Sequence, residues 1–577
     1  MSLSSAVLSL LVLIPASAVT ATPAPAAAAS TGEVDYVSLR DAGRQMQDGT
    51  LTSLELTRHF ITRIALLDHA GPSINSVIEL NPDALDIARQ RDTERTNGKR
   101  GALLGIPVLL KDNIDTGDRM LTTAGSLALA TQPAPRDATI VAKLREAGAV
   151  ILGKTNLSEW ANFRSSHASS GWSARGGQTR NPYVLDRNPC GSSAGSGAAI
   201  AADFATVAIG TETDGSILCP ALMNGIVGIK PTLGLVSRAG IIPISHNQDT
   251  AGPMARNVTD AAILLSVIAG SDPRDPATAD ADQHKTDYTQ YLDADGLKGK
   301  RIGVVRQLAG AEPNADRILD RAIALMREAG AEIVDPVELP HLAEIGDAET
   351  TVLLYDFKHD IAEYLSTRPK SGIATLADLI AFNETHAQKE MPWFGQDLFL
   401  AAQAKGTLDD DEYVQALEKA KRLAGTEGID AALAAHHLDA LLAPSWGPAF
   451  LTDPVLGDHI VSGDPTVGGA SQPAAVAGYP SIAVPAGFAH ALPVGIVLFG
   501  AKWSEPALIT IAYAFEQRVH AFAPPRFLED APMQDASTDG LGVATTTAPV
   551  AAATVASPIL PSEIETTATT PGSGSDN

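Results

Sequence analysis

Basic residues are scarce in this sequence. The 577-residue chain has 42 Lys and Arg against 67 Asp and Glu, which gives a formal net charge of −25. Nucleic acids and anionic membranes are bound mainly by basic surfaces, so we expect neither as a partner. Part of the acidity is local, because no Lys or Arg follows Arg526.

Long apolar runs are also missing. The apolar stretch over residues 8–14 is too short to span a bilayer, and no later segment has the length of a transmembrane helix. Small-residue patterns typical of a cleavage site follow it, so we interpret residues 1–21 as a signal peptide, although no basic residue precedes Arg40. A disordered Ala/Pro tail is the alternative. A signal peptide predicts a periplasmic or secreted protein.

Only two cysteines occur, Cys190 and Cys219. An oxidising compartment would permit one disulfide between them. We expect two free, buried thiols instead, because neither cysteine flanks an obvious loop that needs a crosslink.

Residue patterns that bind metals are incomplete. One acidic stretch lacks the Gly and the terminal Glu of a calcium loop; its members are Asp112, Asn113, Asp115 and Asp118. His436 and His437 are adjacent, so they cannot share one helical face as a zinc pair would. We therefore expect no metal and no organic cofactor.

The composition that is present favours one large globular region. Hydrophobic residues make up 45% of the chain and charged residues 19%, which is enough for a sizeable core. We interpret residues 22–34 as a linker and 35–529 as one folded domain. Residues 530–577 are acidic and rich in Thr, Ala and Pro, so we expect a disordered tail there.

Helix and strand signals alternate along the folded region. Helices are expected at 137–147 (capped by Asp137), 194–204 and 314–329, and strands at 149–152, 206–210, 300–306 and 332–334. Two more buried strands are expected within 475–488 and 492–500. A mostly helical insertion is expected over 345–430, with its loop 391–398 contributing to the substrate pocket. This pattern predicts an α/β fold with three layers, α/β/α, and a mixed central sheet.

Two familiar catalytic motifs match only formally. The pattern from Gly148 to Thr155 fits a phosphate-binding loop, but its middle is an apolar strand rather than a flexible loop. Gly191–Gly195 fits the G-x-S-x-G elbow of a lipase-type esterase with Ser193 as nucleophile. The residues before it suit a loop better than the strand that this elbow requires.

A third combination consists of separated pieces. GIPVLLKDN ends at 113, GSSAGSG spans 191–197 and GTETDGS spans 210–216, followed by GIKPT at 228–232 and GPMAR at 252–256. Each piece alone has an ordinary reading as a surface lysine, a helix cap or a turn. Together and in this order, with the strands near 475–500, they resemble the amidase signature family over residues 35–525, closest to its bacterial peptide amidase branch.

The resemblance implies a role for each matching residue. Lys111 matches the family's base, Ser216 its nucleophile, and Ser192 the relay serine that follows an unusual cis peptide bond after Gly191. Ser193 matches a supporting serine. The oxyanion-hole loop corresponds to the backbone N–H groups of Thr213, Asp214, Gly215 and Ser216.

Physical chemistry explains why a lysine suits this role. A serine hydroxyl needs a base within hydrogen-bond reach, and lysine is a base only when its neutral form is favoured. Burial and the positive end of a nearby helix both favour that form. We therefore expect Lys111 to be buried, largely neutral and hydrogen-bonded to Ser192, which would bridge to Ser216.

The predicted function is hydrolysis of a carboxamide, with a peptide C-terminal amide as the expected substrate. The nearest alternative is a broad primary-amide or aryl-amide amidase. The family also includes the glutamine-hydrolysing component of the tRNA amidotransferase, a role that a leader peptide argues against. An esterase using Ser193 and a non-catalytic binding protein are more distant alternatives. The sequence does not indicate an oligomeric state.

Overall fold

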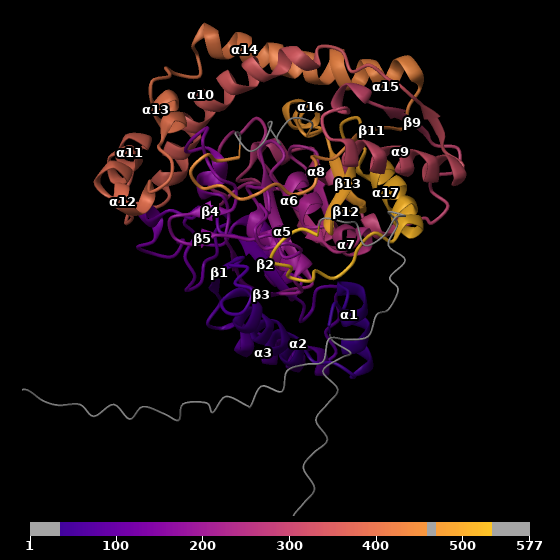
Figure 1. Ribbon diagram of the computed structural model, residues 1–577. Helices are drawn as coiled ribbons and strands as arrows, with labels where there is room; N and C mark the ends of the chain where they lie inside the picture. Colours follow the sequence, from indigo (N-terminus) through magenta and orange to yellow (C-terminus); the bar gives the residue numbers. More distant parts are fainter. Residues whose placement is uncertain (1–34, 459–468, 533–577) are drawn as a thin grey trace, which may run out of the picture. The chain divides into compact units, whose positions relative to one another are not determined.

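A computed structural model describes residues 35–458 and 469–532 (Figure 1). The expected signal peptide, the whole expected linker and the tail beyond residue 532 lie outside the described residues. None of the described helices combines the length and apolar character of a membrane span.

A mixed sheet of 11 strands organises the described residues. Its strands run in the order β1-β3-β2-β6-β8-β7-β12-β13-β11-β9-β10. The pairs β2–β3, β2–β6, β9–β10 and β9–β11 are parallel, and the other neighbouring pairs are antiparallel. The strands are β1 (Val77–Leu80), β2 (Pro107–Lys111), β3 (Val150–Thr155), β6 (Val207–Glu212), β7 (Val227–Lys230), β8 (Thr250–Ala255), β9 (Arg301–Val304), β10 (Glu332–Val334), β11 (Ala440–Pro444), β12 (Ser481–Ala489) and β13 (Leu492–Phe499). The short strands β4 (Trp172–Ser173) and β5 (Gly177–Gln178) form a separate ribbon.

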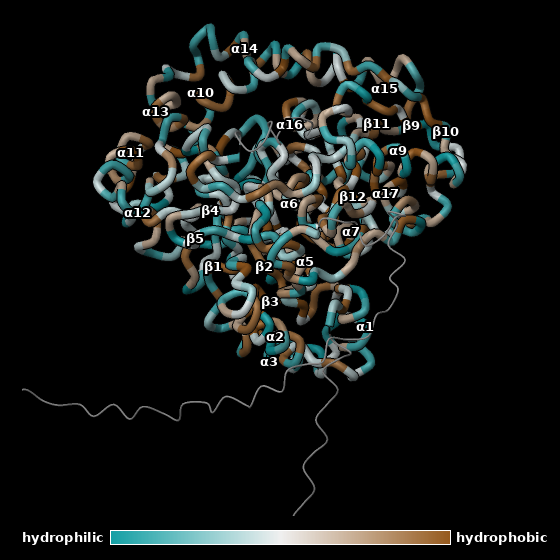
Figure 2. The backbone as a smooth tube through the Cα atoms, viewed as in Figure 1, coloured by the Kyte–Doolittle hydropathy of each residue, from teal (hydrophilic) through white to brown (hydrophobic). Residues whose placement is uncertain are grey.

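Helices cover both faces of the sheet, which confirms the predicted fold class. Every residue of β2, β3 and β6 is buried, as expected for strands covered on both sides. Figure 2 shows apolar residues concentrated in these central strands. The helices that pack on or near the sheet are α1 (Leu39–Asp48), α2 (Ser53–Arg63), α3 (Ala84–Thr96), α4 (Thr139–Glu146), α5 (Ala194–Ala201), α6 (Leu218–Met223), α7 (Val258–Ile268), α8 (Ala281–His284), α9 (Pro313–Glu328) and α17 (Glu505–Val519).

A second group of helices follows β10. These are α10 (Ile345–Ser366), α11 (Leu376–Thr385), α12 (Ala387–Glu390), α13 (Asp397–Gln403), α14 (Asp411–Lys421) and α15 (Asp430–His436), with α16 (Gln472–Ala477) later in the chain. The expected helical character of 345–430 is therefore present. In Figure 1 the long helices α10 and α14 lie side by side, away from β2 and β3, and they contact each other directly.

Some expected boundaries were wrong. Asp137 does not cap α4, which begins at Thr139 after Ala138. Its carboxylate instead accepts a hydrogen bond from the Gly117 N–H (2.7 Å) and pairs with Arg145. Of the segment 475–488, the first residues end α16 and the strand begins only at Ser481. Contacts in the tertiary fold set the start of α4 and the start of β12. A local sequence pattern does not contain those contacts.

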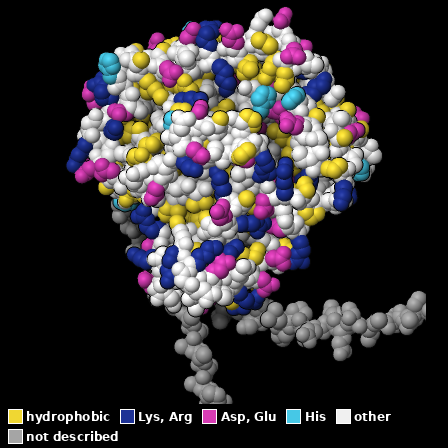
Figure 3. Space-filling model, turned by 180° about the vertical axis from the view of Figure 1, so that it is seen from behind, with side chains coloured by type: hydrophobic (Ala, Val, Ile, Leu, Met, Phe, Trp, Pro, Cys, Tyr) yellow, Lys and Arg dark blue, Asp and Glu magenta, His cyan; other side chains and the backbone are white. Residues whose placement is uncertain are grey.

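Charged groups of both signs share the surface. On the face shown in Figure 3, Lys and Arg side chains are interspersed with Asp and Glu.

Candidate active site

Lys111 is the last residue of β2, and its side chain is fully buried. Its Nζ lies 2.7 Å from Ser192 Oγ, 2.9 Å from Thr211 Oγ1 and 3.1 Å from the Thr211 carbonyl oxygen. Burial lowers the pKa of Lys111 to about 7, against the weaker opposing effects of Asp249 and Glu212. With a pKa of about 7, about half of the Lys111 amines are neutral at pH 7 and most are neutral at higher pH, so a neutral amine is available as a base.

Ser192 follows a cis peptide bond from Gly191 and is fully buried. A Cβ on Gly191 would lie 2.1 Å from Ser158 Oγ, so no larger residue fits there without rearrangement. The next residue, Ser193, donates its hydroxyl to the Thr211 carbonyl (3.0 Å) and accepts from the Thr211 N–H (3.2 Å). Helix α5 starts immediately afterwards, at Ala194.

Ser216 lies in the loop between β6 and α6. Its carbonyl oxygen accepts a hydrogen bond from the Ser193 N–H (3.1 Å), so the two serine segments are adjacent. Within the described part of the chain, its hydroxyl makes no hydrogen bond to Ser192 or Lys111. The structure thus joins Lys111 to Ser192 directly, and it brings Ser216 beside them through the backbone.

The loop before Ser216 is held by a buried polar network. Thr213 donates its hydroxyl to Asp249 (2.6 Å), and its carbonyl accepts from the Gln248 side chain (3.3 Å). Gly215 has φ = 74°, and a Cβ there would lie 3.0 Å from Ser471 Oγ. The loop therefore requires glycine both for its conformation and for space.

The N–H groups of this loop differ in their partners. Over 35–458 and 469–532, no hydrogen bond from the N–H groups of Thr213, Asp214 or Ser216 to a protein acceptor is present. The Gly215 N–H faces the Glu212 carboxylate and, with the N–H groups of Ile217 and Leu218, opposes the rise that burial causes in the Glu212 pKa. Three of the four expected oxyanion donors are thus free of protein partners.

Several buried acids that sequence reasoning missed surround this loop. Burial raises the pKa of Asp249 to about 6. Burial also raises the pKa of Asp214 well above its usual range, with the Glu349 carboxylate adding to the effect. Sequence analysis could have identified Glu212, because this residue belongs to the GTETDGS motif that also contains Ser216. The contacts that Gln248, Asp249 and Glu349 make with the loop have no local sequence signal, because these residues reach it only through the tertiary fold.

A cavity of about 500 Å³ opens beside the serine segments. It is lined by Gly191, Asp214 and Gly215, by Trp446 and by Leu398 of α13. Leu398 belongs to the segment 391–398, which is expected from the sequence to contribute to the pocket. The cavity has room for a substrate next to the loops that carry Ser192 and Ser216.

Cys190 and Cys219 form a disulfide, so the expectation of two free thiols was wrong. The cysteines are 29 residues apart in sequence, but their Cα atoms are 5.9 Å apart. The loop before Ser192 and the start of α6 after Ser216 meet in the fold, and local sequence around each cysteine did not reveal this. The crosslink therefore ties the segments of the two candidate catalytic serines together.

The competing motifs find structural roles instead. Lys154 lies inside β3, fully buried, and donates to the carbonyls of Ile114 and Leu121, so no phosphate loop forms there. The segment before Ser193 is a loop rather than the strand of an esterase elbow. Asp112 pairs with Arg175 and accepts a hydrogen bond from the Thr123 hydroxyl.

Comparison with known proteins decides the family. The model of the Amidase family matches residues 55–509. The chain belongs to the amidase signature family. It is accordingly an enzyme that hydrolyses linear amide C–N bonds.

Individual amidases and their relatives are similar over most of the chain. A probable amidase from Arabidopsis thaliana is 42% identical over 511 residues, which cover 86% of this chain and 93% of the relative. The solved structure of the native peptide amidase from Stenotrophomonas maltophilia is 53% identical with a TM-score of 0.80, covering 85% of this chain and 98% of that one. A glutamyl-tRNA(Gln) amidotransferase component from Thermoanaerobacter pseudethanolicus is 34% identical over 502 residues, covering 86% and 99%.

Proposed function

We propose that this amidase hydrolyses the C-terminal amide of peptides to a carboxylate and ammonia, with Lys111 as base, Ser192 as relay and Ser216 as nucleophile. The 2.7 Å contact between the buried Lys111 amine and the Ser192 hydroxyl carries the proposal. The 53% identity with a peptide amidase supports this substrate class. The adjacent cavity of about 500 Å³ supports a substrate larger than a simple amide.

The hydrogen bonds at Lys111 suit a neutral amine. A neutral amine has two N–H bonds and one lone pair. The carbonyl and hydroxyl oxygens of Thr211 are placed to accept the two N–H bonds. The lone pair is then free to accept the hydroxyl proton of Ser192. Base catalysis requires this direction of proton transfer, from Ser192 to Lys111.

The chemistry proceeds in two halves. Ser216 Oγ attacks the amide carbon while its proton passes to Ser192 and the Ser192 proton passes to Lys111. The N–H groups of Thr213, Asp214 and Ser216 stabilise the oxyanion. The proton returns through the same groups to the leaving nitrogen, which departs as ammonia and leaves an acyl-enzyme. Water then repeats the sequence and releases the carboxylate. The hydrogen bond from Ser216 to Ser192 would form when substrate binds, as catalytic hydrogen bonds often do.

The substrate class can be tested by ammonia release from a panel of peptide amides, simple primary amides, aryl amides and esters. We expect the highest kcat/KM on peptide amides. Hydrolysis of simple or aryl amides with no ammonia from any peptide amide would favour the broad amidase instead. Glutamine hydrolysis that requires added partner proteins would favour the amidotransferase role.

The pH dependence of kcat tests whether Lys111 is the catalytic base. Because Lys111 is active only when neutral and its pKa is about 7, kcat is expected to rise about tenfold per pH unit below pH 7 and to level off above it. Steady-state kinetics between pH 5.5 and 9 measure this, with circular dichroism at each pH as the control for folding. A kcat that stays constant down to pH 5.5 would contradict a lysine base.

We also propose that the enzyme is periplasmic or secreted. The signal peptide expected over residues 1–21 and the Cys190–Cys219 disulfide support this, since disulfides persist in oxidising compartments. Cell fractionation with N-terminal sequencing of the mature protein tests it, and full-length protein confined to the cytoplasm would refute it.

A further inference from the structure

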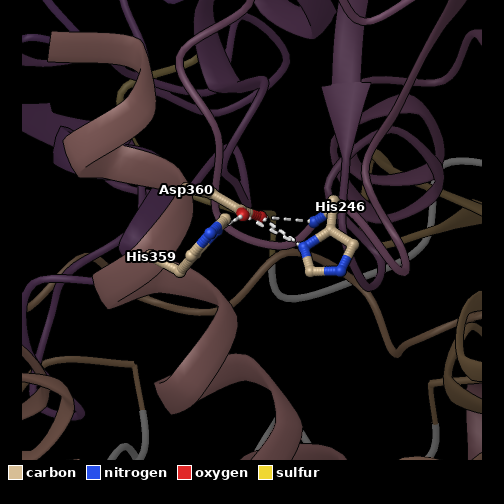
Figure 4. A group of neighbouring side chains, drawn as sticks. All are labelled: His246, His359 and Asp360. Atoms are coloured by element: carbon tan, nitrogen blue, oxygen red, sulfur yellow. Dashed lines mark hydrogen bonds and ion pairs between the residues drawn. The ribbon is translucent and has the colours of Figure 1, made fainter. Parts of the chain in front are cut away.

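A cluster of three side chains with metal-binding atoms lies away from the serines. Figure 4 shows His246 and His359 pointing toward the same carboxylate, that of Asp360. The Nδ1 atom of His359 is 2.9 Å from Asp360 Oδ1, and the Nδ1 atom of His246 is 2.9 Å from Asp360 Oδ2. One ligand atom from each residue lies within 4.8 Å of the other two.

These distances are close to those of a metal centre. Zinc binds imidazole nitrogen and carboxylate oxygen at about 2.0–2.2 Å, so neighbouring ligands of a tetrahedral ion are roughly 3.3 Å apart. The two nitrogen–carboxylate pairs are already that close. The imidazoles have room to turn toward a shared ion, because the side chain of His246 is 43% exposed and that of His359 is 54% exposed.

The surroundings also favour a cation. A second carboxylate, that of buried Asp356, has an oxygen 3.7 Å from His246 Nδ1. The nearby guanidinium of Arg238 is already paired with Asp275. A cavity of about 300 Å³ lined by His246 and Asp360 gives solvent and ions access to the cluster.

An outer partner for one histidine is in place as well. Metal-bound histidines commonly hydrogen-bond through the other ring nitrogen, which fixes the ring. The side-chain amide of Asn247 lies 3.1 Å from His246 Nε2. The Asn247 amide nitrogen also donates to the Asp356 carboxylate (2.9 Å), so it fixes the His246 ring beside Asp360.

A second cluster of the same kind lacks these features. Asp35, His59 and Asp203 also approach one another, but Asp203 is contacted by the guanidinium groups of Arg63 and Arg256. Two cations already neutralise that carboxylate, so a metal ion would gain little there. The contrast singles out His246, His359 and Asp360.

We propose that His246, His359 and Asp360 bind one Zn²⁺, with water completing its coordination. Two imidazoles and one carboxylate are a donor set that zinc accepts readily. The proposal is independent of the substrate of the amidase, because none of the three residues touches Lys111, Ser192 or Ser216.

The position of this zinc site gives it a structural role. His246 belongs to the segment before β8, whereas His359 and Asp360 belong to α10. The same segment contains Gln248, which donates to the Thr213 carbonyl and to Glu349 of α10. Zinc would therefore fasten α10 to the segment that supports the oxyanion loop, and it would raise the thermal midpoint by mass action.

The test is calorimetric titration of the full-length, metal-free protein with Zn²⁺, together with the visible spectrum after Co²⁺ substitution. We expect one ion per chain at micromolar zinc, and a Co²⁺ spectrum typical of four ligands. His359→Ala and Asp360→Asn should each weaken zinc binding at least about tenfold. His359 is exposed and makes few contacts, so its removal should leave the fold intact by circular dichroism.

The matched control is His386→Ala. His386 is also exposed, and its ring bonds to the Phe382 carbonyl and stacks on the Phe382 ring, both in its own helical turn. The His386→Ala variant should bind zinc as tightly as the unaltered protein does. Absence of one bound ion, equal binding by His359→Ala and Asp360→Asn, or an equal loss in His386→Ala would each overturn the site.

Discussion

Ser216→Ala is expected to lower kcat for amide hydrolysis by at least about 10⁴-fold, because removal of a nucleophile leaves only the oxyanion donors and substrate binding. The fold should be unaffected, since the Ser216 hydroxyl makes no hydrogen bond to Ser192 or Lys111 in the described part of the chain. Ammonia release and the thermal midpoint measure the two expectations. A fluorophosphonate probe should label the unaltered enzyme at Ser216 and leave the variant unlabelled.

Ser193→Ala is the informative comparison for that experiment. Its hydroxyl bonds both backbone groups of Thr211, so its loss should reduce stability by about 1–2 kcal/mol while activity persists in the folded fraction. An esterase built on Ser193 predicts the reverse ranking. A Ser216→Ala enzyme with near-normal kcat, or probe attached to Ser193, would replace the proposed nucleophile.

Lys111→Met is expected to lower kcat by about 10³-fold or more, because it removes the base while keeping an unbranched side chain of similar length. The pH dependence near 7 should disappear along with the activity. Steady-state kinetics over the same pH range measure both effects, and differential scanning calorimetry reports folding.

Lys154→Met provides a matched control for the base. Lys154 is likewise fully buried and lies on the neighbouring strand β3, but its amine donates to the Ile114 and Leu121 carbonyls. Its loss should lower the thermal midpoint and leave kcat within about tenfold. If the Lys111→Met variant also kept a kcat within about tenfold of the unaltered enzyme, Lys111 would not be the base.

The sequence predicted the centre of the site better than its surroundings. Lys111 and Ser192 lie in motifs whose order along the chain is informative, and the structure brings their side chains into contact. Asp249 and Glu349 could not be predicted, because they reach the loop from the segment before β8 and from α10. The strand order of the sheet sets those distances, and no local pattern encodes that order.

Two of the wrong local interpretations have the same origin. Asp137 has the residue type of a helix cap, but Gly117 and Arg145 bind its carboxylate. Cys190 and Cys219 have no obvious loop to close, yet the fold places their Cα atoms 5.9 Å apart. In both cases a partner distant in sequence decided the outcome, whereas apolar strands such as β3 depended mainly on their own residues.

The bond between Cys190 and Cys219 bears on how the enzyme should be produced. A bacterial cytoplasm keeps thiols reduced, so protein recovered from it would contain the serine-bearing loops without their covalent link. Export to the periplasm of the production host would allow the link to form. Assays on protein produced in the cytoplasm would then underestimate the activity of the enzyme. Engineering of the cavity would likewise start from a protein whose two serine-bearing loops lack their covalent link.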